Sequence, residues 1–222
     1  MANNQKLVTN TWSHEASLYT SAERQVDSAV QVCANLLAIA GAVWLVLNAR
    51  DSTRLSLAIY GFGLIAVFAS SLAYTLALPG GWKERLRRLD HAMIFVMIAG
   101  TYTPLAAHRL PYPWNIIMLM TVWTGAALGI ILKCAFPRRF EYTGLALCVA
   151  LGLSGLVTIG QLHASVSAAD FGMLVAGMCA YIAGVGVLLL PQLRFHNAAW
   201  HALVLIAAIL QFAAIACELV IG

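Results

Sequence analysis

Charged residues are scarce in this sequence. Only 10% of its 222 residues are Asp, Glu, Lys or Arg, whereas 61% are hydrophobic. Soluble domains carry about 25% charged residues, so this chain has too few polar groups to cover the surface of a soluble globule. The same balance excludes a disordered chain. The net charge of +4 does not indicate nucleic-acid binding, because the basic residues lie in short segments between apolar runs.

The sequence also lacks the patterns of two other classes of protein. Its five cysteines are scattered without a C-x-x-C pair, so neither a disulfide framework nor a cysteine zinc site is indicated. The apolar runs do not alternate with polar residues as the strands of a membrane β-barrel do. What remains is a chain of apolar helices.

Seven apolar runs approach the length of about 20 residues that a helix needs to cross a bilayer. Backbone polar groups in lipid must bond within their own segment, so each run is predicted to be a helix. The predicted spans cover residues 28–49, 55–78, 91–107, 114–132, 143–162, 171–190 and 198–220, of which the third is short. We therefore predict an all-α polytopic membrane protein, with a polar leader at 1–27 and a seven-transmembrane helix bundle at 28–222.

Basic residues are distributed unevenly between the two sides of this bundle. Ten of the thirteen fall on the side of the N-terminus: Lys6, Arg24, Lys83, Arg85, Arg87, Arg88, Lys133, Arg138, Arg139 and Arg194. The other side carries Arg50, Arg54 and Arg109. Because basic loops stay in the cytoplasm, the N-terminus is predicted inside, in a bacterial inner (plasma) membrane.

Polar residues gather at the inner end of four predicted helices. They are Glu23, Asp27, Gln31, Ser70, Tyr74, Asp90, Asn197 and His201. Polar groups at membrane depth are costly and tend to mark function. Taken singly, Asp27 and Asp90 could cap their helices, and Tyr74 could belong to an interfacial aromatic belt. Taken together, the eight residues predict a polar cavity that opens to the cytoplasm.

One stretch carries a family resemblance. Residues 88–104 read RLDHAMIFVMIAGTYTP, and E-x-x-x-D-S at residues 23–28, S-x-x-x-Y at 70–74 and N-x-x-W-H at 197–201 lie around it. These motifs resemble the hemolysin III group, the bacterial branch of the progestin and adiponectin receptor-like (PAQR) membrane proteins. The resemblance covers the chain from about residue 20 to its end.

The resemblance implies a zinc ion held by three histidines near the inner membrane face, with a serine and an aspartate beside it. Some members are thought to hydrolyse lipid amides such as ceramide. Carried over residue by residue, Ser70 and Asp90 would be the catalytic pair and His201 a zinc ligand. The other two ligand positions are Tyr74 and Asn197, and Gln31 replaces a histidine of the first motif.

Two functions are compatible with a chain in which Tyr74 and Asn197 stand at two of the three zinc-ligand positions. Phenol and amide groups are poor zinc ligands beside imidazole, so the chain is predicted to keep the fold without the usual zinc site. It would then act in membrane lipid binding or homeostasis, or as a partner subunit. The alternative is a zinc-dependent lipid amide hydrolase with a rearranged site, in which His201 and Asp90 would join His91 or His196. The expected partners are membrane lipids, and nucleic acid is not among them.

Overall fold

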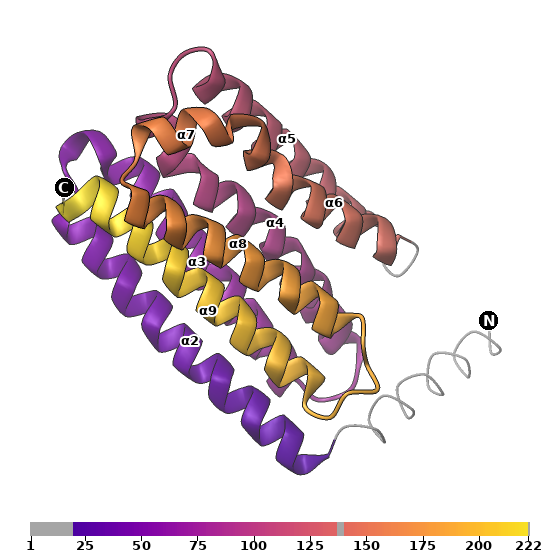
Figure 1. Ribbon diagram of the computed structural model, residues 1–222. Coiled ribbons are helices and arrows are strands. Elements are labelled where there is room, and N and C mark those ends of the chain that lie inside the picture. Colours follow the sequence, from indigo (N-terminus) through magenta and orange to yellow (C-terminus); the bar gives the residue numbers. More distant parts are fainter. Residues whose placement is uncertain (1–19, 137–139, 222) are drawn as a thin grey trace.

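A computed structural model describes residues 20–136 and 140–221, which form a bundle of long helices packed side by side (Figure 1). The helices are α2 (Ser21–Asn48), α3 (Asp51–Leu76), α4 (Gly81–Arg109), α5 (Trp114–Ala135), α6 (Glu141–Leu153), α7 (Ile159–Ser165), α8 (Ala168–Leu188) and α9 (His196–Ala216). A 3₁₀ turn, η1 (Ser154–Thr158), joins α6 to α7, and a π-helical turn, η2 (Cys217–Ile221), extends α9. Within the described ranges all regular structure is helical, which confirms the predicted fold class.

The predicted membrane spans correspond to these helices. Among the residues that the structure describes, six segments are long and apolar enough to cross a bilayer, the fourth of them being α6, η1 and α7 taken together as Tyr142–Ser165. The remaining predicted span, 91–107, is the apolar part of α4, whose first turns are polar. The chain runs up and down the bundle, so α2, α4 and α9 begin at the same end. We call this the Ser21 end and the opposite one the Asn48 end.

Helix α2 begins earlier than the predicted span at residue 28. Thr20 caps it, because the Thr20 hydroxyl accepts from the backbone N–H of Glu23 at 3.2 Å and the Glu23 carboxylate accepts from the N–H of Thr20 at 2.9 Å. This reciprocal pair is a capping box, which fixes a helix start. Residues 21–27 of the predicted leader are therefore helical. Residues 1–19, with Lys6, and residues 137–139, with Arg138 and Arg139, lie outside the described part of the chain.

Helix α4 packs between α3 and α5 (Figure 1). Its contact with α3 is close because Gly100 lacks a side chain: a Cβ there would lie 3.4 Å from the carbonyl oxygen of Ile59. Small residues allow such approach between membrane helices. One apolar cluster fills the space among α2, α3, α4 and α9 around Tyr60 and Ile215, and a second fills the space among α4, α5 and α6 around Phe95.

The break between α6 and α7 is bridged by a side chain of α4. The Tyr102 hydroxyl donates to the carbonyl of Gly152 at 2.5 Å and accepts from the N–H of Gly155 at 3.0 Å. Backbone groups freed at a helix break in lipid need such partners. Tyr102, which belongs to the 88–104 motif, therefore holds the predicted 143–162 span against the centre of the bundle.

We predict that Gly129→Ala destabilises the bundle. The added Cβ would lie 2.3 Å from Cε1 of Phe95, whose ring is fully buried. Overpacking of this kind costs about 1–3 kcal/mol. Thermal unfolding in detergent should show a lowered Tm. Gly186→Ala in α8 is the matched control, because no atom lies within 4 Å of its added Cβ. An equal loss of stability in both variants would contradict the packing.

Candidate functional site

A buried hydrogen-bond network lies at the Ser21 end, and its centre is a contact between α9 and α2. Nδ1 of His201 lies 2.5 Å from Oδ1 of Asp27. The Asp27 side chain is 3% exposed and that of His201 17%. Burying a carboxylate is costly unless it has a partner, so this contact ties the two helices together.

The other ring nitrogen of His201 faces helix α3. Nε2 lies 3.2 Å from the hydroxyl of Ser71, which is buried. Asp90 of α4 lies close to this serine and interacts electrostatically with His201 and Asp27. The network therefore joins α2, α3, α4 and α9, which is the set of four helices that the sequence predicted.

Gln31 completes the network from one turn further along α2. Its Nε2 donates to the Thr75 hydroxyl at 2.8 Å and to Oδ2 of Asp27 at 3.2 Å, and lies 3.2 Å from Nδ1 of His201. The residue is 1% exposed, and its Oε1 has no hydrogen-bond donor among the described residues. Gln31 thus orients both Asp27 and His201.

Helical spacing explains why these side chains meet. Asp27 and Gln31 are four residues apart on α2, and Ser71 and Thr75 are four apart on α3, so each pair shares a face.

A contact from α2 also fixes the start of α9. The carboxylate of Glu23 accepts from the backbone N–H of Phe195 at 3.1 Å, in the residue that precedes α9.

The sequence predicted Ser70 and Tyr74 as site residues, whereas the α3 side chains in the network are Ser71 and Thr75, each one position later. Ser70 donates to the carbonyl of Val67 in its own helix at 3.0 Å, whereas the neighbouring Ser71 contacts His201. Tyr74 packs under the ammonium group of Lys83, and Thr75 contacts Gln31. One residue rotates a side chain by about 100° around a helix, which accounts for the difference. S-x-x-x-T at residues 71–75 has the same spacing and could have been read in its place.

The remaining predicted residues lie at the edge of the network. Asn197 is half-buried in the first turn of α9, one turn before His201. Glu23 lies in the first turn of α2, and its carboxylate accepts from Thr20 and from the N–H of Phe195 rather than from a network side chain. The network side chains contact one another, and the predicted cavity that opens to the cytoplasm stays a prediction.

The residues present do not fit a three-histidine zinc site. Zinc prefers imidazole and thiolate ligands in a tetrahedral set. Of the positions that the resemblance assigns to ligands, only His201 carries an imidazole, and both of its nitrogens already have partners. Within residues 20–136 and 140–221, no three His, Cys, Asp or Glu side chains are placed to hold a metal ion.

Asp27, His201 and Ser71 follow one another in the order of a catalytic triad, carboxylate to Nδ1 and Nε2 to hydroxyl. A nucleophile must also face its substrate. The Ser71 residue is only 6% exposed, and its hydroxyl lies between His201 and Asp90. The arrangement therefore orients an imidazole and links helices, without presenting the hydroxyl to a substrate carbonyl.

We predict that Asp27→Ala and His201→Ala are each strongly destabilising but not additive. Removing one partner of a buried pair costs about 3–5 kcal/mol, because the other partner is left without compensation. The double variant should lose less than the sum of the single losses. A double-mutant cycle of unfolding in detergent measures this coupling, and simple additivity would contradict the contact.

The two neighbouring serines give a second prediction. Ser71→Ala should cost about 1–3 kcal/mol, because it leaves Nε2 of His201 buried without its partner. Ser70→Ala should cost markedly less, since its hydroxyl bonds only to a carbonyl of its own helix. Chemical denaturation of both variants checks the difference, and a larger loss in Ser70→Ala would show that α3 is turned the other way.

Comparisons with known proteins place the chain in a protein family. The family model described as "Haemolysin-III related" matches residues 4–212. The protein named Hemolysin-3 homolog of Bacillus subtilis is 29% identical over 192 residues, which cover 85% of this chain and 90% of that protein. Hemolysin-3 of Bacillus cereus is 30% identical over 182 residues, covering 80% and 83% of the two chains. No solved structure matches.

Proposed function

Since the chain belongs to the haemolysin-III-related family of integral membrane proteins, we propose that it is a member without a zinc site that binds membrane lipids rather than hydrolysing them. The proposal places it in a bacterial plasma membrane, with the Ser21 end toward the cytoplasm. It would contribute there to membrane homeostasis.

The observation that carries this proposal is that both ring nitrogens of His201 already contact protein side chains. Its two nitrogens are 2.5 Å from Asp27 and 3.2 Å from Ser71, so a metal ion would have to displace one of these contacts. The neighbouring positions offer a hydroxyl at Thr75 and an amide at Asn197. Oxygen donors of this kind compete poorly for zinc with imidazole and thiolate sites. These contacts of His201 support a member of the family without a zinc site.

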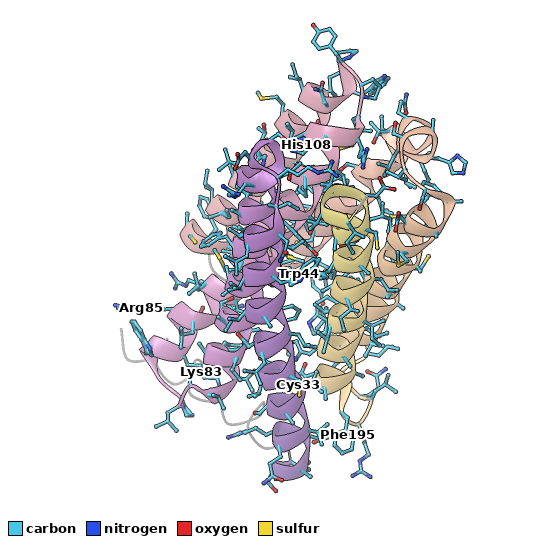
Figure 2. The ribbon with its side chains drawn as sticks, turned by 90° about the vertical axis from the view of Figure 1, so that its left-hand side faces the viewer. Cys33, Trp44, Lys83, Arg85, His108 and Phe195 are labelled. Atoms are coloured by element: carbon cyan, nitrogen blue, oxygen red, sulfur yellow. The ribbon has the colours of Figure 1, made fainter. Side chains whose placement is uncertain are left out.

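The distribution of basic residues supports the orientation. The Ser21 end carries Arg24, Lys83, Arg85, Arg87, Arg88, Lys133 and Arg194 among the described residues, and the Asn48 end carries Arg50, Arg54 and Arg109. Short basic segments stay on the cytoplasmic side. Figure 2 places Lys83 and Phe195 toward one end of the bundle and His108 toward the other.

The surface that the bundle offers supports a lipid ligand. Large apolar side chains such as Leu36, Leu47, Leu55 and Phe62 are more than half exposed along α2 and α3. The connections between the described helices are short, which leaves little room for a soluble domain. Apolar helix faces with polar ends are complementary to acyl chains and headgroups.

Histidine substitutions test the proposal directly. We expect the purified wild type to hold less than about 0.2 zinc per chain, and Thr75→His with Asn197→His to hold close to one, because His201 then gains two imidazole partners. Tyr74→His with Asn197→His is the matched control and should not gain zinc, since residue 74 packs against Lys83 whereas residue 75 contacts Gln31 of the network. Elemental analysis measures the metal.

The opposite result would favour the zinc-dependent hydrolase. A wild type that retains about one zinc per chain, and releases fatty acid from ceramide until a chelator is added, contradicts the proposal. Zinc in the Tyr74 double variant alone would instead show that the expected serine and tyrosine face the network.

A further inference from the structure

A second polar site lies away from the network, at the start of α4. An open pocket there is lined by Gly81, Trp82, Glu84, Arg85 and Arg88. In Figure 2, Lys83 and Arg85 lie on the outer side of the bundle, well apart from Phe195. The pocket contains two guanidinium groups and one carboxylate.

That carboxylate is already engaged. Glu84 accepts from Nη2 of Arg87 at 2.8 Å and from Nε of Arg87 at 3.2 Å. Nε of Arg88 lies 3.6 Å from Glu84, which is too long for a hydrogen bond. This Nε is shielded from solvent and has no acceptor among the described residues. The Arg88 side chain as a whole is 36% exposed, so its terminal guanidinium nitrogens can donate to an anion in the pocket.

The other side of the pocket is aromatic and open. The guanidinium carbon of Arg85 lies 5.8 Å from the centre of the Trp82 ring, and Trp82 is 65% exposed. A Cβ added at Gly80 or Gly81 would meet no atom within 4 Å, so a ligand can approach the backbone there. Tryptophan at this depth favours the headgroup layer of a membrane.

We propose that this pocket binds the phosphate of an anionic phospholipid headgroup, with Arg85 and Arg88 as its charged contacts. Arginine suits phosphate because its planar group can donate two hydrogen bonds at once. The inference rests on the lipid-binding part of the proposed function, and does not depend on whether zinc is bound.

Exposed apolar residues around the pocket favour a lipid over free phosphate. Leu78 is 84% exposed just before α4, and Leu89 is 45% exposed one residue after Arg88. With Trp82 they place apolar surface beside the guanidinium groups. A phospholipid satisfies both parts, since its phosphate meets the arginines and its acyl chains cover the leucines.

Native mass spectrometry of the detergent-purified chain with equal amounts of phosphatidylglycerol and phosphatidylcholine tests the site. The wild type should retain phosphatidylglycerol preferentially. Arg85→Gln with Arg88→Gln should lower that preference by about tenfold or more, because each basic contact to an anionic lipid contributes about fivefold. Arg24→Gln with Arg194→Gln removes the same charge at the same end and should change it by less than about twofold.

Three results would overturn the proposal. The first is an unchanged preference in the Arg85 and Arg88 variant, and the second is an equal loss in the Arg24 and Arg194 variant, which would indicate diffuse charge. The third is release of the lipid by inorganic phosphate at about 10 mM, which would indicate a free-anion site. Arg85→Lys with Arg88→Lys keeps the charge and should retain part of the preference, which separates lost binding from lost folding. Zinc content, measured separately, tests the proposed function by itself.

Discussion

The contact between His201 and Asp27 is the constraint on which the Ser21 end of the bundle depends. A carboxylate this deeply buried needs a partner, and the first turns of α9 bring the imidazole of His201 to it. Once Nδ1 faces α2, Nε2 must face α3, where Ser71 meets it, and Ser71 in turn leads to Asp90 of α4. Unsatisfied polar groups are especially costly in a membrane, so these contacts fix the rotation and height of the four helices relative to one another.

The motif at residues 88–104 acquires a structural account that does not require a metal. Asp90 joins the network, and Gly100 lets α4 approach α3. Tyr102 bridges the break after α6, and the hydroxyl of Thr103 accepts from the indole of Trp123 at 3.1 Å. These residues therefore connect α4 to α3, to the break after α6 and to α5, which suits a helix that packs between the others.

Much of this arrangement could be predicted from the sequence, because long apolar runs determine membrane helices and short basic segments separate the two ends. Asp27, Gln31, Asp90 and His201 are the predicted residues that the structure brings together. The register of α3 could not be settled in this way, since Ser70 and Ser71 are adjacent and both are compatible with the spacing. The break in the fifth span was also not predicted, because it depends on a tertiary partner, Tyr102, rather than on a local proline.

We infer that the two ring nitrogens of His201 are held by Asp27 and Ser71 and not by a metal ion. The decisive measurement is an experimental structure with anomalous data collected above the zinc edge, from protein purified with zinc present. We expect Nδ1 of His201 within hydrogen-bond distance of Asp27 and no anomalous peak at the network. A peak about 2.0–2.1 Å from either nitrogen of His201, the length of a zinc–imidazole bond, would contradict it.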